Sequence, residues 1–313
     1  MTFRLIFVIA LLLGGNTGNL RAQSAAKNPL RLNRFIELME AKTPAFGMFS
    51  QNINARTGAA IADSSLDFVI IDMEHSPYDV TRLENYLLGM INKRKILQKG
   101  NLQPNVVPFV RIPAAGREPV DHLLKQVLDA GVLGVIVPHV DTAEQALAIV
   151  KACRFPQKRM AEDYQPEGKR GVGYRHAARY WGLTPQEYAQ RADVWPLDPQ
   201  GELVVWVMIE TVEAVQNCED IAQTPGVGGL FIGPSDLAFS LGVDKGDPVF
   251  EAAIAQVASI AQKNRIPCGL LSNGDQIQQR LKQGFQFIAV GLDGGLPVDV
   301  HQALEKARKS SIE

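Results

Sequence analysis

Cysteine is scarce in this chain of 313 residues, which has only Cys153, Cys218 and Cys268, an odd number at wide spacing. This spacing provides neither a disulfide framework nor a Cys-x-x-Cys metal clip. We therefore expect free, buried thiols, although export would allow one bridge if two of them met in the fold. An excess of either charge is also missing, with 32 Lys and Arg against 33 Asp and Glu. The balance predicts no surface for nucleic acid and favours a small-molecule partner.

An apolar run long enough to cross a membrane is missing as well. The run at residues 5–13 follows Arg4 and is far shorter than the ~20 residues that span a bilayer. Small and polar residues follow it, up to the sequence RAQSAA, which is the layout of a secretory signal peptide. A membrane anchor or a mistaken start codon is the alternative. We expect residues 1–26 to be cleaved after Ala22 or Ala26, giving an exported protein with no stable membrane span.

From residue 44 onward, short apolar runs alternate with longer amphipathic stretches, which is the pattern of repeated βα units around a parallel sheet. Strands are predicted at residues 45–49, 68–71, 106–110, 134–137, 203–209, 229–232, 267–271 and 287–290. Helices are predicted at residues 54–63, 80–92, 118–130, 142–153, 248–264 and 276–283. Eight such units over about 250 residues indicate an α/β fold of the TIM (β/α)8 barrel type, in one domain over residues 27–313.

Two segments interrupt this pattern, and one helix follows it. Residues 93–105 lengthen a helix-to-strand connection and are predicted to be a surface insertion. Residues 154–201 follow the fourth strand on the face where barrels keep their active sites, so we expect a lid or a subunit contact. A last amphipathic helix is predicted from about Asp299, after Pro297.

Two acids stand at successive strand ends. Glu210 ends the fifth predicted strand, and Asp236 follows the sixth across a Gly-Pro turn. Because the carboxyl ends of barrel strands converge on one mouth, we expect these carboxylates to meet and to bind Mg²⁺, Mn²⁺ or Co²⁺. Taken singly, each acid could instead cap the helix that follows it. Taken together, they favour a divalent-metal site.

The second strand is followed by Asp72, Glu74 and His75. We expect Asp72 to hold the His75 ring in one tautomer, which leaves the other ring nitrogen free to move a proton. Glu74 is expected to brace this pair. A histidine on its own would more often be structural, but the acid beside it and its place at a strand end favour catalysis.

Arg111 ends the third strand, where its guanidinium can face a carbonyl oxygen or a developing enolate, although an Arg there can equally be a structural salt bridge. The turn from Gly233 offers the backbone N–H groups of Ser235 and Asp236 to a substrate carboxylate. No Lys stands at a strand end, as a Schiff-base aldolase would require, so a metal is expected to stabilise the carbanion.

The segments that contain these residues resemble the HpcH/HpaI aldolase family of metal-dependent, class II 2-oxo-acid aldolases. The similar segments are DFVIIDMEHSPYD, PFVRIP, KQVLDAGVLGVIVPHVDTAEQA, KRGVGYRHAARYWG, VMIET and GGLFIGPSDLAFSLG, in the family's order across residues 44 to about 295. The resemblance implies a barrel of the phosphoenolpyruvate/pyruvate type. It also implies that His75 and Asp72 are the acid/base pair, that Arg111 stabilises a pyruvate enolate, and that Glu210 and Asp236 hold the metal.

The same resemblance implies a homo-oligomer, a hexamer of barrels with swapped helices in which Asp129 lines a neighbouring subunit's site. Three features depart from the family pattern: Met73 before the Glu-His pair, Met208 two residues before the metal Glu, and the extended loop at residues 157–167. They border the acceptor side of the site. They therefore concern which substrate is accepted rather than the enolate chemistry.

These observations predict a lyase that cleaves a 4-hydroxy-2-oxo acid reversibly to pyruvate and an aldehyde. One alternative is a CoA-thioester lyase of the malyl or citramalyl type, which would need a basic groove for the CoA phosphates. Lys158, Arg159, Lys169 and Arg170 could supply that groove, although Glu162, Asp163 and Glu167 dilute its charge. The other alternative is an exported barrel that binds acids or sugars without turnover, but binding alone does not require His75.

Overall fold

The computed structural model describes residues 31–113, 119–162, 164–292, 304–305 and 307–308. The predicted signal peptide lies outside these residues, as do Asp163 and most of the predicted last helix, of which the described residues 304–305 and 307–308 are helical. All three cysteines are free and buried, as expected. No helix in the described ranges has both the length and the apolarity that a membrane span requires.

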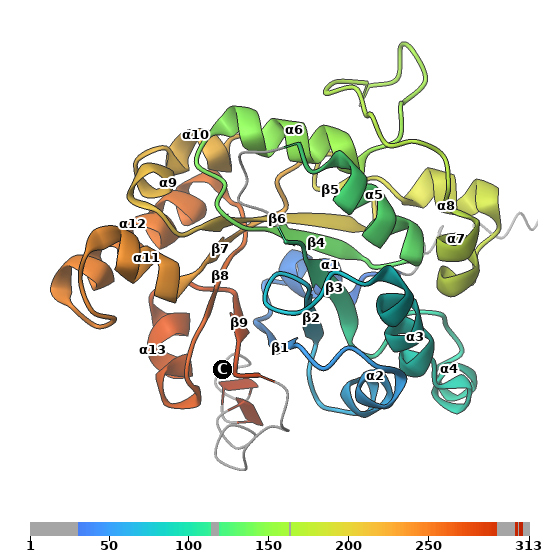
Figure 1. Ribbon diagram of the computed structural model, residues 1–313, viewed down its shortest axis with the longest axis horizontal. Helices are drawn as coiled ribbons and strands as arrows, with labels where there is room; N and C mark the ends of the chain where they lie inside the picture. The colour runs from blue at the N-terminus through green and yellow to red at the C-terminus, as the bar shows by residue number, and fades with distance from the viewer. Residues whose placement is uncertain (1–30, 114–118, 163, 293–303, 306, 309–313) are drawn as a thin grey trace, which may run out of the picture. The chain divides into compact units, whose positions relative to one another are not determined.

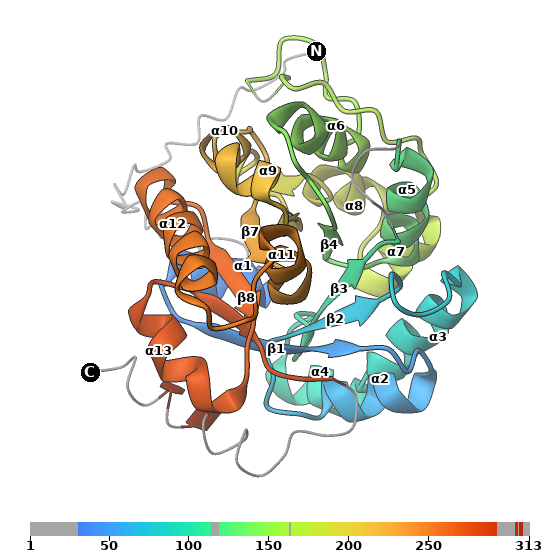
Figure 2. The ribbon, with the colours of Figure 1, turned by 60° about the vertical axis from the view of Figure 1, so that its left-hand side comes forward.

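Eight parallel strands form a closed ring, as predicted (Figures 1 and 2). The order around the ring is β1, β2, β3, β4, β6, β7, β8, β9 and back to β1, with β4 paired directly to β6. The strands are β1 (Ala45–Ser50), β2 (Phe68–Asp72), β3 (Val107–Arg111), β4 (Gly134–Val137), β6 (Leu203–Ile209), β7 (Gly229–Ile232), β8 (Cys268–Leu271) and β9 (Phe287–Ala289). Each lies within a residue of its predicted bounds. The two-residue β5 (Val194–Trp195) pairs beside β6, outside the ring.

Helix α1 (Arg34–Glu40) lies at the amino end of the ring, and the other helices cover its outside (Figure 2). These are α2 (Ala55–Ala62), α3 (Val80–Met90), α4 (Lys93–Lys99), α5 (Asp121–Ala130), α6 (Ala143–Cys153), α7 (Arg175–Trp181), α8 (Pro185–Arg191), α9 (Val212–Gln216), α10 (Cys218–Ala222), α11 (Pro234–Leu241), α12 (Pro248–Asn264) and α13 (Ile277–Lys282). The six predicted helices are present as α2, α3, α5, α6, α12 and α13. The others lie outside the predicted helix ranges, and all of these have eight residues or fewer, too few to show a clear helical period.

Helix α1 closes the amino end of the barrel with Phe35. This ring is fully buried, and its centroid lies 4.9 Å from that of Trp206, 5.2 Å from Phe287 and 5.5 Å from Phe109. All three contacts are edge-to-face, a favoured geometry for aromatic pairs. The barrel interior is thus solid at this end, and the opposite end is left for chemistry.

The N-cap residue Asn33 docks α1 onto the barrel. Its side-chain amide donates to the carbonyl oxygens of Leu133 at 3.0 Å and Glu202 at 2.9 Å, which directly precede β4 and β6. Its side-chain oxygen accepts from the Phe35 amide at 3.1 Å, as N-caps do. Buried polar groups are therefore satisfied where α1 meets the strands.

The excursion at residues 154–201 folds into α7, α8 and β5. Arg154 is fully buried and holds it by a two-point ion pair to Asp193, with Nε–Oδ1 at 2.6 Å and Nη2–Oδ2 at 2.7 Å. Trp181 donates to the Gly131 carbonyl at 2.8 Å, which ties α7 to the end of α5. The insertion at residues 93–105 contains the short helix α4.

Candidate active site at the carboxyl end of the barrel

Asp72 and Arg111 stand side by side because β2 and β3 are in register at their last residues. Arg111 donates from Nε to Asp72 Oδ1 at 2.9 Å and from Nη2 to Asp72 Oδ2 at 2.7 Å. Gln51, directly after β1, donates to the same Oδ2 at 3.0 Å, and the guanidinium lies 4.6 Å from the centre of the Phe49 ring. This two-point geometry fixes the plane of the guanidinium.

The Asp72 carboxyl is fully buried and ionised. Burial raises its pKa, but the hydrogen bonds and charge of Arg111 outweigh burial and, with the bond from Gln51, hold the pKa below its ordinary value of 3.8. Asp72 also accepts from the backbone N–H groups of Glu74 at 3.2 Å and His75 at 3.3 Å. It therefore orders both the arginine and the turn that carries the histidine.

His75 lies closer to Arg111 than to Asp72. Its Nδ1 is 2.7 Å from Arg111 Nη2, 3.5 Å from Asp72 Oδ2 and 3.6 Å from Glu74 Oε2. The expected direct bond from Asp72 to the ring is thus replaced by a chain in which Asp72 binds Arg111 and Arg111 contacts the ring. Because guanidinium only donates, Nδ1 accepts here and the neutral ring carries its proton on Nε2.

Glu74 shares the Arg111 charge, with 3.1 Å between Glu74 Oε2 and Arg111 Nη1. Burial is the largest influence on its pKa and raises it, although the positive charge of Arg111 opposes the shift. Atoms of Asp72, Glu74 and His75 that could bind a metal lie within 4.8 Å of one another. Arg111 already contacts all three, and a cation placed among them would be repelled by it. This group is therefore better suited to proton transfer than to holding a metal.

Glu210, directly after β6, is 1% exposed. Its Oε1 accepts from the His139 backbone N–H at 2.7 Å, and the His139 ring Nδ1 lies 3.6 Å from the same oxygen. On the other side, a Cβ atom at Gly233 would collide with Oε2. The alternative that Glu210 caps a helix is excluded, since Thr211 is the N-cap of α9.

Asp236 lies in the first turn of α11, on the next strand connection around the ring. Gly233 is the N-cap of this helix, so Asp236 is not the cap. Both Ser235 and Asp236 are exposed, and within the described ranges no acceptor is recorded for their backbone N–H groups. Such free N–H groups at a helix N-terminus suit a carboxylate, as expected from the sequence.

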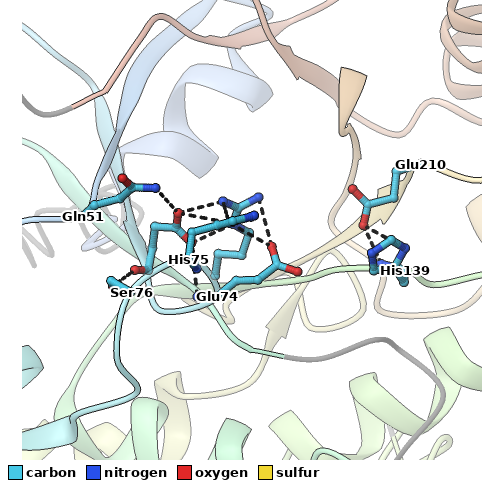
Figure 3. A network of polar contacts seen from close by, with 8 residues as sticks. Gln51, Glu74, His75, Ser76, His139 and Glu210 are labelled. Carbon is cyan, nitrogen blue, oxygen red and sulfur yellow. Dashed lines mark hydrogen bonds and ion pairs between the residues drawn. The ribbon is translucent and has the colours of Figure 1, made fainter. Parts of the chain in front are cut away.

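The cluster around Glu74 and His75 and the pair formed by Glu210 and His139 lie separately in Figure 3, but charges of the first act on Glu210. Burial raises the pKa of Glu210 to about 8; the negative charges of Asp236 and Glu74 raise it further, while the His139 N–H bond and Arg111 lower it. Charges from the carboxyl ends of β2 and β3 and from α11, and a backbone hydrogen bond from the residues after β4, thus act on the carboxylate after β6. The structure therefore brings together Asp72, Glu74, His75, Arg111, Glu210 and Asp236 at one mouth.

Asp129 belongs elsewhere within this chain. It lies in α5, where it pairs with Lys125 and accepts from Arg170 at 2.8 Å. Arg170 is itself buried against Phe155, with 4.5 Å from its guanidinium to the ring centre, and donates to Tyr188 at 3.0 Å. Asp129 therefore takes part in anchoring the excursion to the outer helix layer.

Two residues at the carboxyl end of the barrel, Gln51 and His139, were not predicted from the sequence. The rule that residues after barrel strands converge at this end applies to them as well. Gln51 directly follows β1, and His139 stands two residues after β4. His139 has a φ of 51°, in the left-handed region that non-glycine residues rarely adopt. This backbone turn directs its N–H to Glu210, which no sequence pattern would indicate.

Comparison with known proteins agrees with this geometry. The chain is 33% identical over 267 residues to a 5-keto-4-deoxy-D-glucarate aldolase of Escherichia fergusonii, covering 84% of this chain and 92% of the relative. It is 32% identical over 285 residues to a protein of the same name from Klebsiella pneumoniae, covering 90% and 99%.

Solved structures agree as well. An HpcH/HpaI aldolase/citrate lyase family protein of Burkholderia cenocepacia J2315 superposes with a TM-score of 0.69 at 29% identity, covering 90% of this chain and all of the other. The citrate synthase SbnG superposes with a TM-score of 0.64 at 24% identity, covering 88% and 96%, which shows the fold alone. The family profile described as HpcH/HpaI aldolase/citrate lyase matches residues 45–299. The chain therefore belongs to the HpcH/HpaI aldolase/citrate lyase family.

Proposed function

We propose that this family member is a divalent-metal-dependent aldolase that cleaves a 4-hydroxy-2-oxo acid reversibly to pyruvate and an aldehyde. The burial of the Glu210 carboxyl is the observation that carries the proposal. This carboxylate is 1% exposed, and burial together with the negative charges of Asp236 and Glu74 raises its pKa, so a divalent cation would offset the cost of ionising it. Binding alone would not require such an arrangement next to a histidine and an arginine.

The residues present fit a divalent ion. Glu210 and Asp236 would hold it, and oxygen ligands of this kind suit Mg²⁺, Mn²⁺ or Co²⁺. When bound, the ion would polarise the 2-oxo group of the substrate as a Lewis acid. Gly233 leaves the space that the Glu210 carboxylate needs, since any side chain there would collide with it.

The side chains of the mouth would handle the proton. His75 would take the 4-hydroxyl proton at Nε2, which requires that the ring carry its own proton on Nδ1. The carboxylates of Asp72 and Glu74, within 3.6 Å of Nδ1, are acceptors for that N–H. The ring's side chain is 56% exposed and so has room to exchange its Arg111 contact for one of them.

The carbon–carbon bond then breaks, the aldehyde leaves and the electron pair remains on the pyruvate enolate. The positive charge of Arg111 would stabilise this enolate. The enolate carbon takes a proton back from His75, which yields pyruvate and neutral histidine. The free N–H groups of Ser235 and Asp236 would bind the substrate carboxylate.

The substrate class follows from the relatives named for 5-keto-4-deoxy-D-glucarate. We therefore place this dicarboxylate first in a panel of 4-hydroxy-2-oxo acids. Pyruvate is measured by a coupled assay with Mg²⁺, Mn²⁺ or Co²⁺ and after chelation. Pyruvate release that depends on the metal is expected. Full activity after chelation would contradict the proposed requirement for a metal. Tight substrate binding without pyruvate release would favour a barrel that binds acids or sugars without turnover.

Gly233→Ala is a direct steric test of the metal site. The backbone at Gly233 has a φ of −87°, which alanine adopts without strain, so the added methyl acts through its collision with the Glu210 carboxylate and a close approach to the Met208 side chain. We expect metal affinity, measured by calorimetry, to fall at least about tenfold, by analogy with changes around metal ligands.

Gly171→Ala is the matched control, because the nearest atom to its new methyl is Lys125 Cε at 3.4 Å. Metal affinity should be unchanged there. Equal metal affinity in Gly233→Ala and Gly171→Ala would contradict the proposal that Glu210 is a metal ligand.

The CoA-thioester alternative loses one of its basic groups. Arg170 is 2% exposed and paired with Asp129, so it cannot line a groove for phosphates. Lys158, Arg159 and Lys169 are exposed, with Glu162 and Glu167 exposed beside them. The excursion therefore offers a mixed surface rather than a basic one.

The proposal includes a hexamer in which Asp129 lines a neighbour's site. Asp129 sits on the outer helix layer of its own barrel, where a second subunit could reach it. Light scattering after size exclusion should give about six times the mass of the mature chain. A monomer with full activity would exclude this role for Asp129.

A further inference from the structure

A cavity of about 270 Å³ lies far along the barrel from the proposed active site. Its lining includes Asn105 and Leu133, which precede β3 and β4, so it opens at the amino end of these strands. The end of α3, the insertion at residues 93–105 and the end of α7 form its walls, on one side of the barrel (Figure 1). The chemistry of the mouth does not involve these residues.

The interior of the cavity is apolar and its rim is cationic. Met90, Ile96, Leu102 and Trp181 contribute apolar surface. Cations line it as well, and no Asp or Glu is among its lining residues; the cations are Lys93, Lys95, Lys99 and Arg179. A pocket with this composition is complementary to a molecule with an apolar body and a negative end.

Most of that positive charge is not neutralised by neighbouring acids. Lys95 pairs with Asp63 at 2.6 Å. Lys99 donates to the Gln103 carbonyl oxygen, and for Lys93, Lys99 and Arg179 no ion pair is recorded within the described ranges. The nearby Glu37 accepts from the Gln103 amide at 2.8 Å instead.

Like charges crowd Lys99 in particular. Burial lowers the pKa of its ammonium group, and the charges of Arg34 and Lys95 lower it further. An anion at this rim would relieve both the repulsion and part of the desolvation cost. The local electrostatics therefore favour a negatively charged ligand over a neutral one.

We propose that this cavity binds an amphipathic carboxylate of roughly ten to twelve non-hydrogen atoms, because a 150 Å³ apolar cavity holds the six of benzene. The apolar body lies between α4 and α7, and the carboxylate lies at the cationic rim. One wall is built by residues 93–105, so the site depends on the insertion. It does not depend on the aldolase chemistry.

Calorimetry on the full-length protein tests the ligand class with four probes. Octanoate, with ten non-hydrogen atoms, should bind with a Kd of about 1 mM or tighter. Octanol, which lacks the charge, should bind at least about tenfold more weakly, and inorganic phosphate, which lacks the apolar body, should give no signal. Phosphatidylglycerol vesicles distinguish a free carboxylate from a membrane surface and should not bind. Equal affinity for octanoate and octanol, or binding only to vesicles, would overturn the proposal.

Matched substitutions on α4 locate the site. Ile96→Trp fills the cavity and should abolish octanoate binding, whereas Leu97→Trp, on a side chain that is 83% exposed, should not change it. Lys99→Glu reverses a rim charge and should raise the Kd at least about tenfold, as removal of a favourable charge does.

Arg94→Glu makes the same charge reversal on α4 outside the cavity and should leave the Kd unchanged. If Ile96→Trp does not fold, the comparison of Lys99→Glu with Arg94→Glu still tests the site. Octanoate binding that survives both Ile96→Trp and Lys99→Glu would place the ligand elsewhere. Pyruvate release should be the same in all four variants, so failure here is separable from failure of the proposed aldolase.

Discussion

Glu210→Gln is expected to lower kcat/KM for metal-dependent pyruvate release by at least about 10³-fold, since Lewis-acid stabilisation by a metal contributes several kcal/mol. The amide keeps the shape of the carboxyl and can still accept from the His139 N–H. It cannot offer the negative charge that a divalent ion needs. The coupled pyruvate assay measures the loss.

The same variant should fold as well as the parent without metal. Burial raises the pKa of Glu210, so an ionised carboxylate is unfavourable in the metal-free protein and the neutral amide removes that penalty. The melting temperature without metal should therefore not fall. Glu213→Gln, in the exposed first turn of α9, is the matched control and should keep full activity. Normal turnover in Glu210→Gln would refute the role of Glu210 as a metal ligand.

Phe35→Ala should destabilise the protein more than any change at the mouth. The ring is fully buried among Phe68, Phe109, Trp206 and Phe287, and removing it leaves a cavity that these rings cannot fill. Truncation of a buried Phe costs about 3–5 kcal/mol in the free energy of unfolding. Urea denaturation followed by tryptophan fluorescence measures it, since Trp206 lies in the same cluster.

Phe239→Ala is the comparison for this stability test. Its side chain is 88% exposed in α11, so the same truncation should change the free energy of unfolding by less than about 0.5 kcal/mol. A similar loss in the free energy of unfolding in both variants would mean that Phe35 does not form part of the barrel core. If Phe35→Ala does not express, Phe35→Leu retains most of the volume and should show a smaller loss in the same direction.

The strands were predictable because each is short, apolar and bounded by polar or turn residues. Parallel strands buried on both faces produce such runs, and eight of them in a chain of this length leave few folds. The amino-terminal α1 was not predicted, because its seven residues mix charged and apolar side chains. Its role depends on Phe35 entering the barrel, which is a tertiary contact.

The candidate site was predictable as a set of residues but not as a set of contacts. The rule that strand ends converge brought Asp72, Arg111 and Glu210 together without coordinates. The contact between Arg111 and the His75 ring depends on side-chain conformations that sequence does not specify. The sequence also left Arg170 among the candidates for a basic groove, whereas the fold buries it against Phe155.

The two ends of the barrel strands contribute to different parts of the protein. Phe68, Phe109 and Trp206 surround the α1 plug, while a few residues later the same strands deliver Asp72, Arg111 and Glu210 to the mouth. Substitutions in the loops that follow the strands can thus change which aldehyde is accepted without disturbing the aromatic cluster at the amino end of the barrel. Substrate choice and thermal resistance should accordingly evolve as independent traits in this scaffold.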